Sequence, residues 1–218
     1  MSKKYEVTLT GKSPLLMHND NIEWSDFLTE WLKEPQNKKT SVAGDDRSPA
    51  WRWIGSLYID GGVVAMPSDN LMTMLREGGA KCPTGKKGAT FKRQTQSGLI
   101  IDQHSWHIET AAGRVSAADI DALRKENDFS VHQSMVGDMG FSLFVKRAKI
   151  GNNKHIRVRP RFDTWSISGT ITALDETITK DVLGLILDTA GRYCGLCDWR
   201  PSSARAPGYF GQFSATVK

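Results

Sequence analysis

The residues that could do chemistry include a Cys-x-x-Cys pair close to the C-terminal end. Cys194-Gly-Leu-Cys197 has the spacing of two zinc ligands. A structural zinc site needs four ligands, however, and only Cys82 and scattered histidines remain to complete one. We therefore interpret these cysteines as small buried or half-buried side chains at the end of a helix. The sequence predicts no metal and no cofactor.

The histidines offer a second kind of chemistry, because a general base and a general acid can cleave RNA at a 2′-hydroxyl without a metal. His18 is the best placed, since it follows the first predicted strand in a loop. A ribonuclease that uses His18 is therefore an alternative function. A lone histidine in a loop more often has a structural role or contacts a phosphate, so we do not expect an enzyme. The five histidines are His18, His104, His107, His132 and His155.

Basic residues are concentrated in two segments. Residues 146–161 form the most basic part of the chain, and Gly151-Asn-Asn153 marks the turn of a β-ribbon in which Arg157 and Arg159 share one face. Residues 81–97 are rich in Lys, Gly, Thr and Gln, which is typical of a flexible loop. Each phosphate that such side chains neutralise adds about one unit to the salt dependence of binding; the alternative is a solvated ribbon. The predicted phosphate contacts are Lys86, Lys87, Lys92, Arg93, Lys146, Arg147, Lys149, Lys154, Arg157, Arg159 and Arg161.

The stretch from Gly191 to Phe213 combines glycines, prolines, arginines and aromatic residues. Aromatic rings beside arginines can stack bases and hold phosphates, at about 1–3 kcal/mol per stacked base. The residues in question are Trp199, Arg200, Arg205 and Tyr209, with core packing as the alternative for Trp199. Three glycines would either let backbone N–H groups approach an anion or serve turns, namely Gly195, Gly208 and Gly211. We expect this stretch, the Lys86 loop and the Arg157 ribbon to line one groove.

Composition limits the function classes. The chain has 218 residues, 39% hydrophobic and 24% charged, and the net charge of +5 with a pI of about 9.1 suits an anionic partner. One domain spanning 1–218 is expected. Three cysteines give no disulfide framework, and the start from Met1 to Tyr5 leads into a strand pattern without a signal core or a bilayer-spanning run. These features predict a cytoplasmic protein with no membrane partner.

Hydrophobic periodicity predicts the elements that must position these residues. Strands are expected at 5–9, 57–59, 63–66, 99–101, 106–108, 141–145, 165–173 and 209–217, and helices at 24–31, 49–57, 68–77, 117–125 and 178–192. Pro35 should end the first helix, and a surface loop should follow from Gln36 to Arg47. This order fits a ferredoxin-like or RRM-like α+β fold, an antiparallel βαββαβ sheet with helices on one face. Insertions are expected at approximately 20–56 (helical), 80–135 (basic loop and small elements) and 146–161 (basic ribbon).

Three islands of sequence resemble a known group. They are Leu9-Thr-Gly-Lys-Ser-Pro-Leu-Leu16, Met66-Pro-Ser-Asp-Asn-Leu-Met-Thr-Met-Leu-Arg76, and Gly195-Leu-Cys-Asp-Trp-Arg-Pro201 with Gly208-Tyr-Phe-Gly-Gln-Phe213. Together they resemble the RAMP superfamily of CRISPR-associated proteins, in particular the backbone subunits that line up along a guide RNA. Asp198-Trp-Arg-Pro201 stands where that family has a denser glycine and basic cluster, so the chain resembles a divergent relative, such as a phage or plasmid protein.

The resemblance implies an RRM-like fold, binding to single-stranded nucleic acid and polymerisation along it. Together with the basic segments, it leads us to expect a largely sequence-independent binder of single-stranded RNA or DNA that forms a homo-oligomer or filament, with other subunits of a ribonucleoprotein complex as further partners. The second alternative, after the ribonuclease, is an assembly protein that binds other proteins through its tryptophan-bearing helix, from Trp24 to Trp31.

Overall fold

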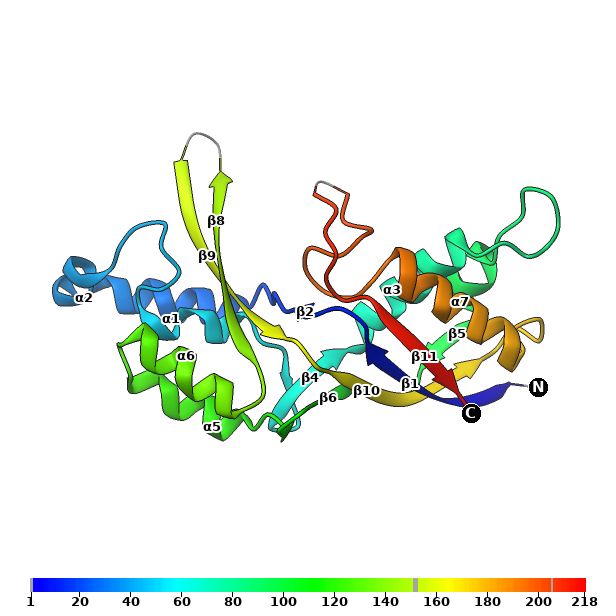
Figure 1. The fold of residues 1–218 in the computed structure, drawn as a ribbon, viewed down its shortest axis with the longest axis horizontal. Coiled ribbons are helices and arrows are strands. Elements are labelled where there is room, and N and C mark those ends of the chain that lie inside the picture. Colours follow the sequence, from blue (N-terminus) through cyan, green and yellow to red (C-terminus); the bar gives the residue numbers. More distant parts are fainter. Residues whose placement is uncertain (1, 151–152, 205) are drawn as a thin grey trace.

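The computed structural model describes residues 2–150, 153–204 and 206–218, and it has an antiparallel sheet as its largest feature (Figure 1). The strand order is β11-β1-β10-β6-β4-β3, with β5 also paired to β10 and β7 to β6. The predicted α+β class, an antiparallel sheet with helices, is confirmed. The strands are β1 (Lys3–Gly11), β3 (Ile59–Asp60), β4 (Val63–Pro67), β5 (Leu99–Ile101), β6 (Ser105–Thr110), β7 (Gly113–Arg114), β10 (Ser166–Ala173) and β11 (Phe213–Val217).

Alternation of buried and exposed side chains along β1 shows which face of the sheet is covered. Tyr5, Val7 and Leu9 are buried while the residues between them are exposed or half-buried, as expected for a strand with one covered face. Leu9 lies opposite Ile167 of β10, which is also fully buried. The period-two pattern of the sequence therefore predicted the buried face of both central strands.

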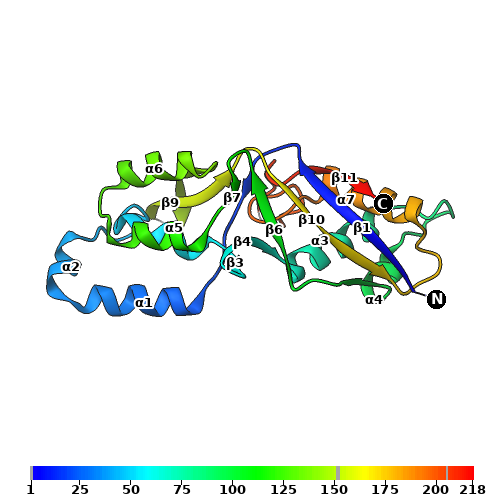
Figure 2. The ribbon, with the colours of Figure 1, turned by 90° about the horizontal axis from the view of Figure 1, so that it is seen from below.

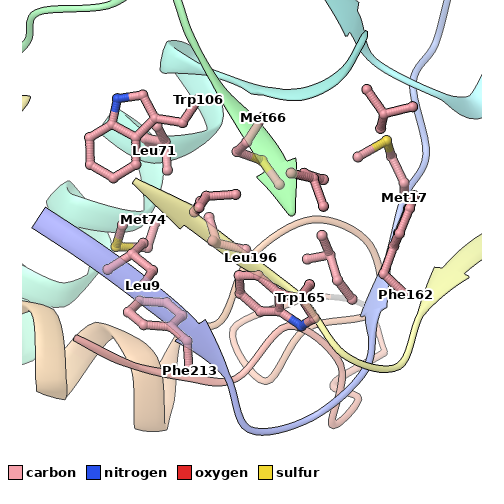
Figure 3. Close-up of a cluster of buried hydrophobic side chains, with 14 of the residues drawn as sticks. Leu9, Met17, Met66, Leu71, Met74, Trp106, Phe162, Trp165, Leu196 and Phe213 are labelled. Atoms are coloured by element: carbon pink, nitrogen blue, oxygen red, sulfur yellow. The ribbon is translucent and has the colours of Figure 1, made fainter. Parts of the chain in front are cut away.

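Two helices, α3 (Ser68–Lys81) and α7 (Lys180–Tyr193), pack against each other on the upper side of the sheet in Figure 1. A short helix, α4 (Lys92–Ser97), continues this layer beyond α3. The close-up shows Leu71 and Met74 of α3 beside Leu9 and Trp106 of the sheet (Figure 3). These apolar faces form the core because each element buries one side only.

A second, three-stranded sheet has the order β2-β9-β8 and carries the remaining helices beside it. These helices gather at the end of the molecule opposite to α4 and α7 (Figures 1 and 2). The elements are β2 (Leu15–Leu16), β8 (Ser142–Ile150), β9 (Asn153–Phe162), α1 (Ile22–Lys33), α2 (Pro35–Thr40), α5 (Ala117–Ala122) and α6 (Phe129–Asp138), with 3-10 turns η1 (Ala50–Ser56) and η2 (Leu123–Lys125). In the part of the chain described, no helix is long and apolar enough to cross a membrane.

Four predicted features differ from the structure for identifiable reasons. Pro35 ends α1 as predicted, but the surface loop predicted from Gln36 to Arg47 begins with the helix α2, in which Pro35 takes the first position, where its missing N–H costs nothing. The helix α4 lies inside the predicted flexible loop, because a buried threonine anchors it to α3. The last strand begins at Phe213 rather than at Tyr209. The strand predicted at 141–145 and the ribbon predicted at 146–161 are one continuous hairpin, β8–β9.

The helix α6 was not predicted at all. Its N-cap is Asp128, whose side chain accepts a hydrogen bond from the backbone N–H of Ser130. Only His132 and Val136 are buried, so the helix lacks an apolar stripe that the sequence could reveal. The buried His132 accepts a hydrogen bond at Nδ1 from the indole N–H of Trp53, at 3.0 Å. A polar residue thus does the anchoring that apolar residues do elsewhere.

Two alanine substitutions in α7 should change stability in opposite directions. A Cβ at Gly191 would overlap the main-chain carbonyl of Phe213, so Gly191→Ala should lower the free energy of unfolding by roughly 1–3 kcal/mol. A Cβ at Gly184 meets no described atom within 4 Å, so Gly184→Ala should raise it by about 0.4–1 kcal/mol. Urea unfolding of both variants measures the difference. Equal midpoints would contradict the close approach of α7 to β11.

Candidate nucleic-acid interface

The hairpin β8–β9 projects from the body of the molecule, and its register fixes which side chains share a face (Figure 1). Lys146 lies opposite Arg157, and Phe144 lies opposite Arg159. Directly opposed residues of an antiparallel pair lie on the same side. The register therefore confirms that Arg157 and Arg159 share a face. The predicted turn residues Gly151 and Asn152 lie outside the described residues.

The loop between α7 and β11 projects on the same side of the molecule as the hairpin (Figure 1). Residues 196–212, which we call the C-terminal loop, are tied at their base to the segment that follows β1. The N–H of Gly211 donates to the carbonyl of Pro14, and the N–H of Asp198 donates to the carbonyl of Leu16. Cys197 and Trp199 have φ values of 61° and 50°, in the left-handed region that residues other than glycine seldom adopt.

The three glycines of this region do not present their N–H groups to a ligand. The N–H of Gly195 donates to Ala190, that of Gly208 to Arg200 and that of Gly211 to Pro14. Gly195 and Gly211 have φ values of 70° and 71°, the left-handed region that glycine tolerates. Of the two roles considered from sequence, the structure assigns them turns rather than contact with an anion.

A cleft of about 810 Å³ separates the hairpin from the C-terminal loop. Basic residues of the hairpin form one wall and the loop forms the other. Two predicted groups of residues, the ribbon and the terminal stretch, are therefore brought together. The charged and aromatic residues that line the cleft are Glu77, Phe144, Lys146, Arg147, Lys149, Arg157, Arg159, Asp198, Trp199 and Arg200.

Two aromatic rings, Phe144 and Trp199, line this cleft, and Phe210 and Tyr209 extend the same ring cluster behind them. Trp199 is half-buried and stacks on Phe210, with 5.5 Å between ring centroids, while Phe144 of the hairpin lies against both. The ammonium of Lys146 lies 3.1 Å from the centre of the Trp199 ring, a cation–π contact. Tyr209 stacks on Phe210 at 4.4 Å and remains 57% exposed. Tyr209 is therefore the ring most accessible to a base.

Two of the predicted phosphate contacts are instead tied to a buried carboxylate. Asp46, whose side chain is only 6% exposed, accepts from Arg157 Nη1 at 3.0 Å and from Arg159 Nη1 at 3.5 Å. It also accepts from the backbone N–H of Val158, and Arg52 lies 3.5 Å away. Burial lowers the pKa of Arg159, an effect that the nearby carboxylates oppose. Arg157 and Arg159 thus hold the hairpin in place rather than standing free for a ligand.

Two further arginines are also paired within the protein. Arg161 donates to Asp163, at 2.5 Å from Nη2, and Arg200 donates to Glu77 at 2.7 Å. By contrast, within residues 2–150, 153–204 and 206–218 no ion pair involves the four other cations of the hairpin. These unpaired cations are Lys146, Arg147, Lys149 and Lys154, all exposed. Arg205 lies outside the described residues.

Lys149 and Lys154 face each other directly across the hairpin. Like charges in this arrangement destabilise a strand pair. A polyanion bound near the end of the hairpin would relieve their repulsion. The unpaired cations, rather than the arginines near its base, are therefore the residues of the hairpin best suited to phosphates.

The Lys86 loop does not contribute to this cleft. Lys86 and Lys87 lie in the loop that follows α3, and Lys92 and Arg93 lie on α4, all four exposed. Figures 1 and 2 both show this loop at the end of the molecule away from the hairpin. Of the three segments that the sequence predicted to line one groove, the β8–β9 hairpin and the C-terminal loop therefore do so and the Lys86 loop does not.

His18 lies beside Arg159 and does not line the cleft between the hairpin and the C-terminal loop. Its Nε2 is 3.1 Å from Arg159 Nη2, which donates to it, and its Nδ1 is 3.8 Å from a carboxylate oxygen of Asp198. Burial lowers the pKa of His18, as does the charge of Arg159, while Asp198 and Asp20 oppose the shift. The neutral ring therefore uses Nε2 as an acceptor for Arg159, and that nitrogen is not available as a general base in this arrangement.

The cysteines occupy apolar surroundings. Cys194 is buried at the C-terminal end of α7, and Cys197 contacts the sulfur of Met66 at 3.6 Å. Burial raises the pKa of Cys194 to about 11 and that of Cys197 to about 12, so both thiols keep their protons at neutral pH. Among the described residues, no three His, Cys, Asp or Glu side chains are grouped to hold a metal ion.

The tryptophans of α1 point inward rather than toward a partner. Trp24 and Trp31 both contact the ring of Trp51 edge-on, at 5.7 and 5.5 Å between centroids. The indole N–H of Trp24 donates to the carbonyl of Arg52. Arg124 lies over the Trp24 ring at 4.6 Å. The aromatic stripe therefore attaches α1 to the rest of the chain, and the outward side of the helix is charged and polar, with Ile22 and Phe27 exposed at its edges.

Several residues of the site were not singled out from sequence. Phe144 and Phe210 could have been found, because strand alternation places Phe144 beside Lys146 and Phe210 follows Tyr209 directly. Asp46 gave no signal, since it lies in a polar loop and its partners in the hairpin are more than 100 residues away in the chain. Comparison of the sequence with protein-family models and with curated proteins finds no match.

Removal of the Asp46 carboxylate should be costly. Asp46→Ala leaves Arg157 and Arg159 without their shared buried counterion and should lower the free energy of unfolding by roughly 3–5 kcal/mol. Chemical denaturation measures the loss. The matched control is Asp163→Ala, which removes the more exposed partner of Arg161 and should cost less than about 1 kcal/mol. Similar losses for the two variants would refute a structural role for Asp46.

Proposed function

We propose that this protein binds single-stranded RNA or DNA, largely independently of sequence, in the cleft between the β8–β9 hairpin and the C-terminal loop. One observation carries the proposal: cations that form no ion pair with any described residue lie across a single cleft from aromatic rings. The hairpin contributes Lys146, Arg147 and Lys149 to the lining, and the C-terminal loop contributes Trp199. The exposed ring of Tyr209 joins the same aromatic cluster through Phe210. Channels for single strands combine these features, because cations track the backbone while rings stack bases.

The fold is compatible with this proposal. Taken as β1, α3, β5, β10, α7 and β11, the core elements have the order of a βαββαβ unit, with strands arranged β11-β1-β10-β5. We propose that this core is ferredoxin-like or RRM-like, a layout that RNA-binding modules often use. The hairpin and the α1–α2 region would then be insertions that build the cleft beside it.

The proposal extends to assembly. By the resemblance of its three sequence islands to RAMP backbone subunits, we propose that copies of the chain line up along the bound strand as a homo-oligomer or filament. Other subunits of a ribonucleoprotein complex would then be additional partners. A ribonuclease role for His18 is not favoured, because Arg159 already donates to its Nε2.

Neutralising the unpaired cations should weaken the salt dependence of binding. For Arg147→Gln combined with Lys149→Gln, we expect the slope of log affinity against log salt to fall by roughly 1.4, or 0.7 for each lost contact to a single strand. Fluorescence anisotropy titrations of single-stranded RNA and DNA over a range of salt concentrations measure it. Arg161→Gln is the control and should leave the slope unchanged, because Asp163 already neutralises Arg161. A flat dependence for the wild-type chain would refute the proposal.

Loss of the exposed ring should weaken binding without unfolding the protein. Tyr209 is 57% exposed and stacks by one face on Phe210, so Tyr209→Ala removes an exposed stacking surface from the aromatic cluster that includes Trp199. We expect binding roughly 5- to 150-fold weaker, equivalent to about 1–3 kcal/mol per stacked base. Tyr209→Phe keeps the ring and should bind like wild type. Equal affinities for the alanine and phenylalanine variants would exclude stacking at this position.

A further inference from the structure

Two surfaces near opposite ends of the long axis of the molecule carry opposite charge, one on α1 and one on the Lys86 loop with α4, while α2 beside α1 carries the exposed Lys38 and Lys39. Helix α1 lies at one end, and the Lys86 loop with α4 lies at the other, as both ribbon views show (Figures 1 and 2). The nucleic-acid cleft lies between them and uses neither. The charged surfaces at the two ends therefore take no part in the proposed binding of nucleic acid.

The outward side of α1 is acidic. Glu23, Asp26 and Glu30 are spaced three and four residues apart, which places them along one side of the helix, and all three are exposed. Glu30 pairs with Lys33, whereas Glu23 and Asp26 form no ion pair with any residue that the structure describes. Two apolar side chains flank them, Ile22 at 76% exposure and Phe27 at 44%. We call these five residues, 22, 23, 26, 27 and 30, the acidic face.

The other end is basic. Lys86, Lys87, Lys92 and Arg93 are all exposed, and none of them forms an ion pair inside the described ranges of the chain. An exposed apolar residue accompanies them: Leu174 is 48% exposed, and its N–H donates to the carbonyl of Gly98 just after α4. We call these five residues the basic end. Each surface thus combines unpaired charge of one sign with an exposed apolar side chain.

We propose that the basic end of one copy docks on the acidic face of α1 of the next copy. The inference deepens the proposed assembly along nucleic acid and rests on it. Opposite charge steers the two surfaces together, and like charge opposes any pairing of two basic ends or of two acidic faces. A contact between two different surfaces is heterologous, so it generates a row of copies, which is open or closes into a ring, instead of a two-fold dimer.

Charge reversal tests the contact in the full chain without nucleic acid. Sedimentation velocity at low salt should show assembly of the wild type that high salt disperses. Lys86→Glu with Lys87→Glu should weaken assembly by about tenfold or more, as should Glu23→Lys with Asp26→Lys. An equimolar mixture of the two variants should assemble again, because each reversed surface then meets its complement on the other variant. The control, Lys12→Glu with Lys218→Glu, makes the same charge change on neither surface and should behave as wild type.

Three results would overturn the inference: a wild type that stays monomeric at low salt, reversed variants that assemble normally, or a mixture that does not recover. Anisotropy with a single strand too short for two copies is measured in parallel. If Lys86→Glu with Lys87→Glu reduces that binding and leaves assembly intact, the loop binds nucleic acid and the inference is wrong. If the mixture recovers assembly but no variant or wild type binds the short strand, the contact stands and the nucleic-acid function fails.

Discussion

The placement of the cleft depends on one buried carboxylate. Asp46 holds Arg157 and Arg159 of the hairpin and accepts from the backbone of Val158 between them, so three consecutive residues of β9 are fixed to a loop far away in sequence. Two guanidinium groups so close together would otherwise repel each other and drive the strand outward. The hairpin can therefore project from the body at a defined angle while its outer half remains charged and exposed.

The sequence predicted the elements of this fold better than it predicted their contacts. Alternation in β1 and β10 and helical spacing in α7 identified the sheet and its covering helix, because these elements each bury one regular face. Helix α6 was missed because a hydrogen-bonded histidine, rather than an apolar stripe, attaches it to the core. This hydrogen bond depends on where the fold places Trp53, and the residues of α6 themselves give no information about that position.

The same distinction applies to the site. Residue type and strand alternation were enough to identify Lys146, Arg147 and Lys149 as exposed cations and to place Arg157 beside Arg159. They could not separate free cations from neutralised ones, because the counterions Asp46 and Glu77 come from distant segments. The Lys86 loop was assigned to the same groove on composition alone, and composition carries no information about distance.

The contact between Lys146 and the Trp199 ring has a consequence for how a ligand enters. Its ammonium covers a ring face on which a base could stack. If the cleft holds a single strand as proposed, an incoming base would displace that ammonium, which would then be free to pair with a phosphate. One side-chain rotation would thus uncover the stacking surface and free a cation at the same time.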